Sequence, residues 1–185
     1  MKRICIFCGS SFGKNRVYKE GVVSLGEAMA ERKIELVYGG SNLGLMGEIA
    51  RAVLGKNGIV YGVIPLSLSE NVEPLDVTEL IIAKDMHERK AKMHELSDAF
   101  IAMPGGIGTL EEIIEAMTWL QLGLHKKPVA FFNIGGFYDR LIDFLDFSAG
   151  EGFIRQIDLD RIIISDNPVE LLSLIEKYKY RLPAG

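Results

Sequence analysis

The sequence lacks the features on which several common classes of protein depend. Its 185 residues include two cysteines and three histidines, and they carry a formal net charge of −4. Proteins that bind nucleic-acid polymers or membrane surfaces normally present a basic face, so both partners are disfavoured. No apolar run approaches the roughly 20 residues that a membrane span requires, and no signal peptide is recognisable. We therefore expect a cytoplasmic protein that works on a small molecule.

The scarce cysteines and histidines also give little basis for a metal site. Cys5 and Cys8 form a C-x-x-C pattern, but Cys5 falls inside an expected strand, where residues three apart point to opposite faces. There is no second cysteine pair for zinc, and His87 and His94 are too far apart for the H-E-x-x-H pattern. We expect neither a metal nor a cofactor.

The length and a hydrophobic content of 48% fit one globular domain over residues 1–185. Short apolar runs alternate with segments of helical periodicity throughout the chain. The expected strands are Arg3–Phe7, Glu35–Tyr38, Ile59–Ile64, Glu79–Ala83, Ala99–Ala102, Pro128–Phe132 and Arg161–Ile164. Helices are expected in most of the intervals, including Gly136–Glu151, and after Asn167, whereas Leu66–Thr78 reads as a loop that could cover a ligand. This alternation predicts a Rossmann-like, doubly wound parallel sheet with helices on both faces.

The stretch Met103–Glu112 joins an apolar run to a helix through a glycine loop and reads MPGGIGTLEE. Glycines allow backbone N–H groups to approach an anion closely, and the positive end of the helix dipole favours an anion there. The stretch therefore predicts a binding site for a phosphate group. Two simpler interpretations stay open, because Thr109 and Glu112 have the spacing of a capping box and the glycines could form only a tight turn.

Other loops of small residues follow the first two expected strands. These small residues are Gly9, Ser10, Gly39, Gly40, Gly44 and Gly47. The G-x-G-x-x-G pattern is absent and Tyr38 supplies no acidic group for a ribose, so NAD is not expected. Ligands of open parallel sheets bind at the carboxyl ends of the strands, where these loops, the central motif and Arg89 should converge. The resulting set of groups suits a sugar phosphate.

Two segments together resemble a known family. Met86–Lys90 reads MHERK and Pro104–Glu112 reads PGGIGTLEE, which is similar to the paired signature of the Lonely Guy family of phosphoribohydrolases. The resemblance covers nearly the whole chain. It includes CGSS at 8–11, VYGG at 37–40, GLMG at 44–47, GVIP at 62–65 and TWLQLG at 118–123.

This resemblance implies hydrolysis of the N-glycosidic bond of an N6-substituted adenosine monophosphate to the free base and ribose 5-phosphate. Arg89 and Glu112 would form the catalytic pair. The implied substrate contacts are Lys90, Gly105, Gly106, Ile107, Gly108, Thr109, Leu110, Glu111 and Thr118. The family arrangement also implies a homodimer through the helix that carries Trp119, and the alternative is a tryptophan wholly inside the monomer core.

The sequence departs from the family pattern at two places. A family glutamate upstream of Arg89 would align near Asn71, with Glu70 or Glu73 close by, so its position stays unassigned. The second glycine loop has Ser41 where a third glycine is usual, a change that we expect to be tolerated.

The residue types suit the implied chemistry. Cleavage of a ribosyl bond builds positive charge on the sugar, and a carboxylate such as that of Glu112 stabilises it or activates the attacking water. Arg89 would bind phosphate or ribose hydroxyls and is expected to lower the pKa of Glu112, unless it is only a surface arginine on a helix.

Three other functions stay open at this point. The chain could be a general AMP nucleosidase, because the residues around an N6 substituent look like core. It could bind nucleotide without turnover, as related carriers of molybdenum cofactor do. The label "lysine decarboxylase", often given to this motif, would require a lysine that holds pyridoxal phosphate, and Lys90 is available but nothing recognisable binds a pyridine ring.

Overall fold

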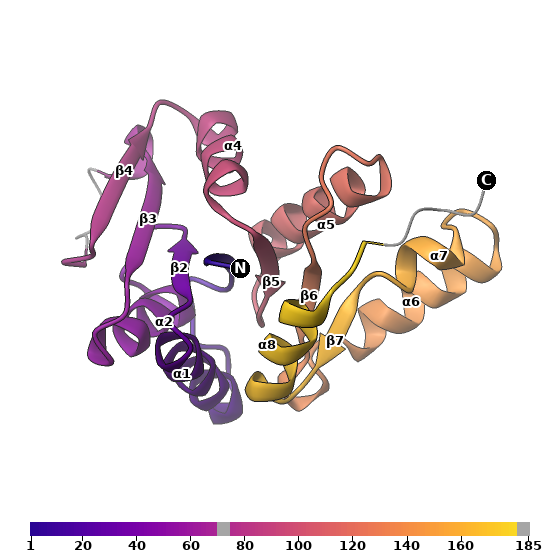
Figure 1. The fold of residues 1–185 in the computed structure, drawn as a ribbon, viewed down its shortest axis with the longest axis horizontal. Helices are drawn as coiled ribbons and strands as arrows, with labels where there is room; N and C mark the ends of the chain where they lie inside the picture. The colour runs from indigo at the N-terminus through magenta and orange to yellow at the C-terminus, as the bar shows by residue number, and fades with distance from the viewer. Residues whose placement is uncertain (70–74, 181–185) are drawn as a thin grey trace.

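The computed structural model describes residues 1–69 and 75–180. Within these ranges, parallel strands form one seven-stranded sheet in the order β4-β3-β2-β1-β5-β6-β7. The strands are β1 (Arg3–Phe7), β2 (Glu35–Tyr38), β3 (Val60–Pro65), β4 (Glu79–Ala83), β5 (Ala99–Ala102), β6 (Val129–Phe132) and β7 (Ile163–Ser165). The order runs outward from β1 in both directions, so the winding reverses between β1 and β5 (Figure 1). The predicted Rossmann-like, doubly wound fold is confirmed.

Helices cover both faces of the sheet. The helices are α1 (Arg16–Glu31), α2 (Gly44–Gly55), α3 (Leu66–Ser69), α4 (Met86–Leu96), α5 (Ile107–Gln121), η1 (Ile134–Gly136), α6 (Asp139–Gly150), α7 (Gln156–Leu159) and α8 (Pro168–Lys177). Apolar residues of α1, α2 and α8 form one core with the sheet, and residues of α4, α5 and α6 pack on the other face. In the described part of the chain, no helix is long and apolar enough to cross a membrane.

The strands supply both cores because neighbouring residues point to opposite faces. In β1, Ile4 and Ile6 belong to the core of α1, α2 and α8, whereas Cys5 and Phe7 belong to the core of α4 and α5. Cys8 joins the first of these cores, so the two cysteines lie on opposite faces of the sheet as predicted. Both thiols are buried and free.

Two helices begin directly after residues whose type is typical of an N-cap. Asp85 accepts a hydrogen bond from the Glu88 N–H at 2.9 Å at the start of α4. Asn167 accepts bonds from Val169 and Glu170 at 3.0 Å at the start of α8. These caps satisfy N–H groups that have no acceptor inside their own helix.

The alternative interpretation of Thr109 and Glu112 as a capping box is wrong. Helix α5 begins at Ile107 with Gly106 as its N-cap, and no side chain caps it. Thr109 is therefore the third residue of the helix, buried against the glycine loop, and Glu112 lies a turn further along. Glu112 is consequently free of any capping role.

Two other expected elements differ from the structure. The helix expected over Gly136–Glu151 begins only at Asp139, because Gly135 and Gly136 have φ angles of 64° and 68° that end the short η1 turn. The segment expected as a loop after β3 starts with the short α3. Residues 70–74, which include Glu70, Asn71, Glu73 and Pro74, lie outside the described residues, so the unassigned family glutamate and the middle of the expected Leu66–Thr78 loop stay untested.

Candidate active site

A pocket of about 470 Å³ opens at the carboxyl ends of the strands, beside the reversal between β1 and β5. This is the edge at which open parallel sheets bind ligands. The loops after β1, β2 and β5 contribute to it, together with α4 and α5. Its lining residues are Cys8, Gly9, Ser10, Gly39, Ser41, Leu43, Met46, Ile64, Leu68, Met86, Arg89, Gly106, Ile107, Gly108, Thr109, Glu111 and Glu112.

Backbone contacts hold the three loops together. The Gly9 N–H donates to the carbonyl of Pro104 at 3.0 Å, and the Gly9 carbonyl accepts from the Met46 N–H at 3.2 Å. Gly44 has a φ of +54°, and a Cβ there would overlap the backbone of Ser10. Only glycine fits a left-handed conformation this close to another chain segment. The loop after β2 is thus shaped to pack on the loop after β1.

The N-terminus of α5 faces the pocket with little side-chain cover. A Cβ added at Gly106 or Gly108 would meet no other atom within 4 Å. The N–H groups of the first turn have no acceptor inside the helix, and they carry the positive end of the helix dipole. Ile107 stands between the two glycines and is 83% exposed. The geometry is that of a site for an anion.

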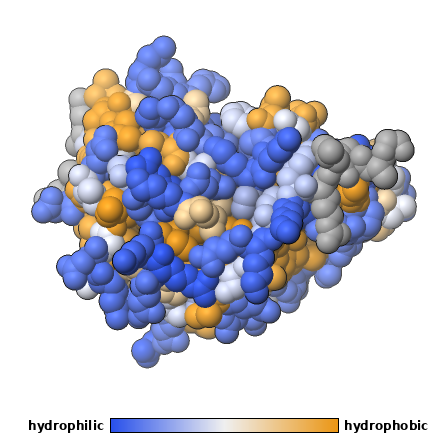
Figure 2. Space-filling view, in the orientation of Figure 1, coloured by the Kyte–Doolittle hydropathy of each residue, from blue (hydrophilic) through white to orange (hydrophobic). Residues whose placement is uncertain are grey.

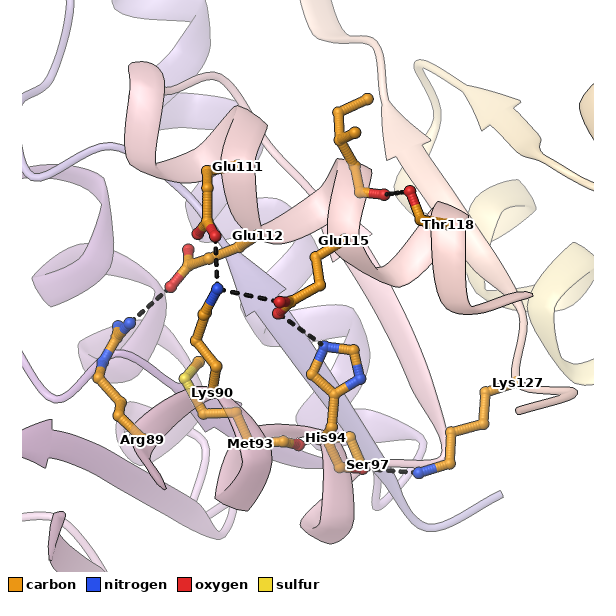
Figure 3. A network of polar contacts seen from close by, with 11 residues as sticks. Arg89, Lys90, Met93, His94, Ser97, Glu111, Glu112, Glu115, Thr118 and Lys127 are labelled. Atoms are coloured by element: carbon orange, nitrogen blue, oxygen red, sulfur yellow. Dashed lines mark hydrogen bonds and ion pairs between the residues drawn. The ribbon is translucent and has the colours of Figure 1, made fainter. Parts of the chain in front are cut away.

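Arg89 and Glu112 meet at the wall of this pocket. Arg89 lies in the first turn of α4, and its Nη1 donates to Oε1 of Glu112 at 2.6 Å while its Nε donates to the carbonyl of Val63 at 3.1 Å. The two side chains are 9% and 12% exposed. Gly39 makes room for them, because a Cβ there would overlap the guanidinium group. Arg89 is therefore a fixed, nearly buried group rather than a surface arginine (Figure 3).

Burial controls the ionisation of Glu112. It raises the pKa of the carboxyl group above its ordinary value of 4.5, although the charge and hydrogen bond of Arg89 act in the opposite direction. Arg89 thus acts on the pKa of Glu112 in the expected direction, but burial outweighs it and the net shift is upward. The free-energy cost of removing this carboxylate from water exceeds the stabilisation that the single nearby cation provides.

A second polar cluster lies beside this pair. The ammonium group of Lys90 forms ion pairs with Glu111 and with Glu115, the latter at 3.0 Å. The second oxygen of Glu115 lies 3.9 Å from Nε2 of His94. Burial lowers the pKa of His94 to about 4, so the imidazole is neutral at pH 7. Figure 3 shows Lys90 between the two carboxylates.

The structure brings most of the predicted site residues to one pocket. Those that line it are Gly9, Ser10, Gly39, Arg89, Gly106, Ile107, Gly108, Thr109, Glu111 and Glu112. Those outside its lining are Gly40, Gly44, Gly47, Lys90, Gly105, Leu110 and Thr118. Several of the latter glycines support the loops, whereas the Thr118 hydroxyl donates to the Ile114 carbonyl on the exposed face of α5. Their contacts with a substrate stay predictions.

Sequence reasoning missed the apolar part of the pocket and one carboxylate. The missed lining residues include the apolar Leu43, Met46, Ile64, Leu68 and Met86, as well as the polar Ser41. Apolar residues in a strand or helix read as core, so their type alone gave no signal. Glu115 did carry one, since it lies four residues after Glu111 and therefore on the same side of a helix. Within the described residues, no group of three His, Cys, Asp or Glu side chains is placed to hold a metal ion.

The fold and the site define a class: Rossmann-like α/β proteins with a glycine-rich pocket at a helix N-terminus beside a buried arginine–glutamate pair. A family model described as "Possible lysine decarboxylase" matches residues 46–175. Over 96% of this chain, the sequence is 46% identical to the cytokinin riboside 5'-monophosphate phosphoribohydrolase LOG7 of Arabidopsis thaliana, of which 82% is covered. It is 49% identical, over 96% of this chain, to the enzyme LOG of Oryza sativa subsp. japonica, of which 74% is covered. The chain belongs to this family of phosphoribohydrolases.

Solved structures of more distant proteins share the fold. The molybdenum cofactor binding protein of Rippkaea orientalis matches with a TM-score of 0.72 at 22% identity, over 95% of this chain and 96% of that one. The Moco carrier protein of Chlamydomonas reinhardtii gives a TM-score of 0.73 at 19% identity over the same shares. At such identities the likeness extends to the fold alone.

Proposed function

We propose that this protein hydrolyses the N-glycosidic bond of an N6-substituted adenosine 5'-monophosphate, a cytokinin riboside monophosphate, to the free base and ribose 5-phosphate. The observation that carries the proposal is the buried Arg89–Glu112 pair on the wall of a pocket that also contains the free N-terminus of α5. Two relatives, 49 and 45% identical and covered over 74 and 84% of their own length, are named as enzymes of this activity.

The pocket offers a different surface for each part of such a substrate. The phosphate group would lie at the N–H groups of Ile107 and Gly108, where the helix dipole favours negative charge. The base would face the apolar part of the lining, to which Leu43, Met46 and Met86 contribute. The ribose would then lie between them, within reach of Glu112.

Glu112 is the group suited to act on the ribosyl carbon. As the bond between that carbon and the base nitrogen breaks, its electron pair leaves with the base and the sugar takes on positive charge. The Glu112 carboxylate stabilises that charge and can take a proton from the water that adds to the carbon. Arg89 keeps the carboxylate oriented through Nη1 and is itself fixed by the Val63 carbonyl. No step requires a metal or a redox group.

The functional unit that we propose is a homodimer in the cytoplasm, joined through the exposed face of α5. Thr109, Ile113, Ala116 and Leu120 are buried on one side of this helix. Trp119, near the C-terminal end of the helix, is only half-buried and packs on His94. Leu122 and Leu124, which follow the last residue of the helix, are each 67% exposed. Figure 2 shows apolar patches among the hydrophilic residues of one face of the molecule. An apolar face beside a half-buried tryptophan favours a second copy as its cover.

Turnover of two nucleotides tests the proposal. The purified protein is incubated separately with AMP and with isopentenyladenosine monophosphate, and the free base is measured by chromatography. Preferential release from the isopentenyl nucleotide supports the proposed function, and equal release from both indicates a general nucleosidase. Nucleotide binding without release of base would contradict the enzyme proposal and favour a carrier.

A further inference from the structure

Lys90 is held by two carboxylates of α5 that differ in their exposure to solvent. Its ammonium group pairs with Glu111, whose side chain is 51% exposed, and with Glu115, whose side chain is 23% exposed. The two glutamates are four residues apart and lie on the same side of the helix. Lys90 itself is 15% exposed, and the two pairs raise its pKa, so it stays protonated.

The two carboxylates also differ in their relation to the pocket. Glu111 lines it, whereas Glu115 lies outside the lining and is turned toward His94. The buried second oxygen of Glu115 has no hydrogen-bond partner among the described residues. His94 is packed between the rings of Phe100 and Trp119, at 4.5 and 4.4 Å, and is neutral at pH 7. Lys90 is therefore the cation that compensates the charge of Glu115.

We propose that Glu115 is a positioning residue that anchors Lys90 beside the pocket, and that Glu111 is its exchangeable partner. On this proposal, which rests on the proposed function, the phosphate group of the substrate takes the place of Glu111 at the ammonium group. Glu111 can leave Lys90 at little cost, because it is half exposed and water or a ribose hydroxyl can hydrogen-bond to its oxygens. Glu115 cannot leave Lys90 at little cost, because its charge would stay partly buried without a counterion.

By holding Lys90 in place, Glu115 limits the electrostatic repulsion between the carboxylates of the pocket wall and a bound phosphate. Glu111 and Glu112 are adjacent carboxylates that both line the pocket into which the phosphate dianion would enter. Lys90 offsets their repulsion only while it remains close to them, and its long side chain has many alternative conformations in water. Glu115 restricts Lys90 to the conformations that serve the pocket.

The test compares a ligand that carries the phosphate with one that does not. Ribose 5-phosphate is a product and is not turned over, and adenosine has no phosphate. We expect Glu115→Gln to weaken the binding of ribose 5-phosphate about tenfold, as measured by calorimetry, because one charged hydrogen bond is lost. The affinity for adenosine should stay unchanged. In turnover, KM for the nucleotide should rise by a similar factor while kcat changes less than threefold, roughly as expected for lost binding alone.

Two further variants separate an anchor from a general structural role. If Glu115 acts through Lys90, the substitution Glu115→Gln should have no further effect in a Lys90→Gln background. Glu95→Gln is the matched control, because it removes the same charge from an exposed pair with Lys92; it should leave both affinities unchanged. Should Glu115→Gln fail to fold, Lys90→Gln must still lose affinity for ribose 5-phosphate and not for adenosine.

The outcomes distinguish this inference from the function on which it rests. Equal binding of ribose 5-phosphate by wild type and Glu115→Gln overturns the anchor, even when wild type releases base. Equal losses for both ligands, or additive losses in the double variant, also overturn it. If wild type releases no base but the selective loss is found, the anchor stands and the proposed hydrolysis fails. Absence of ribose 5-phosphate binding to wild type contradicts the exchange at Lys90.

Discussion

Arg89 and Glu112 lie 23 residues apart in the chain, yet their side chains are joined by a hydrogen bond of 2.6 Å and both are nearly buried. The fold creates this pair by placing the first turn of α4 opposite the second turn of α5 at the carboxyl edge of the sheet. Burial of two charges costs free energy that good geometry only partly returns. Such pairs are common in active sites, where a carboxyl group with a shifted pKa can act in catalysis.

The substitution Glu112→Gln should separate activity from stability. The amide oxygen of glutamine can still accept a hydrogen bond from Arg89, but it carries no negative charge for the transition state. We expect kcat to fall by roughly 10²- to 10⁴-fold, with the thermal midpoint within about 5 °C of wild type. Base release and thermal unfolding are the measurements, and Glu95→Gln is the control. Unchanged turnover would remove Glu112 from the mechanism.

Arg89→Lys should show that the guanidinium group is needed for more than its charge. Lysine keeps the positive charge but cannot donate to Glu112 and to the Val63 carbonyl in the geometry that Arg89 uses. The loss of one charged hydrogen bond of about 2 kcal/mol corresponds to a fall of roughly thirtyfold in kcat/KM. Steady-state kinetics on the isopentenyl nucleotide measures it. A lysine variant as active as wild type would reduce Arg89 to a source of charge.

The dependence on pH should differ in sign between activity and stability. Burial raises the pKa of Glu112 above 4.5 in the folded protein, so the acid limb of kcat/KM should have its midpoint above pH 4.5. The folded protein then binds this proton more tightly than the unfolded chain. The contribution of Glu112 to the free energy of unfolding is thus fully present below its unfolded pKa and is lost as the pH rises through the folded pKa.

Urea unfolding at several pH values tests the second half of that prediction. The free energy of unfolding of Glu112→Gln, relative to wild type, should increase as the pH rises from about 4 to 7, since glutamine does not titrate. Glu95→Gln should show no such trend. A relative stability of Glu112→Gln that falls over this interval would mean that the pKa of Glu112 is lowered by folding.

Much of the fold could be predicted from the sequence because local and tertiary preferences agree. The buried strands are short apolar runs, and Asp85 and Asn167 mark helix starts by a local hydrogen bond that needs no other part of the chain. At the start of α5, local and tertiary preferences disagree. Thr109 and Glu112 fit a capping box, but tertiary packing buries Thr109 against Gly105 and pairs Glu112 with Arg89.

The site was predictable only where its residues form a motif. Glycine loops and the two charged residues of the pair proposed to be catalytic, Arg89 and Glu112, stand out in the sequence. Glu115, the proposed anchor of Lys90, and the apolar residues Leu43 and Met86 do not, because a carboxylate on a helix and an apolar residue near a strand have many ordinary roles. The pKa of Glu112 was misjudged for a related reason, since its sign depends on a degree of burial that only the folded structure gives.

Gly39 should tolerate no side chain, because Arg89 occupies the space where a Cβ would lie. We expect Gly39→Ala to displace the guanidinium group, to lower the free energy of unfolding by about 1–3 kcal/mol and to reduce kcat/KM at least as much as Arg89→Lys. Gly55→Ala is the matched control, since a Cβ there would meet no other atom within 4 Å at the end of α2. Its effect should stay within about 1 kcal/mol. Full activity in Gly39→Ala would show that Arg89 need not hold its observed position.

The proposed dimer gives the last prediction. A charge at Leu122 or Leu124, each largely exposed in the monomer, should cost little in folding but would be buried without a partner in a dimer joined there. We expect Leu122→Glu to raise the dimer dissociation constant by at least about thirtyfold, or 2 kcal/mol, as measured by sedimentation equilibrium. Leu174→Glu, on the exposed side of α8, is the control and should leave it unchanged. A wild-type protein that sediments as a monomer, or a dimer indifferent to Leu122→Glu but broken by Leu174→Glu, would place the contact elsewhere, because only a surface buried by the second copy penalises the new charge.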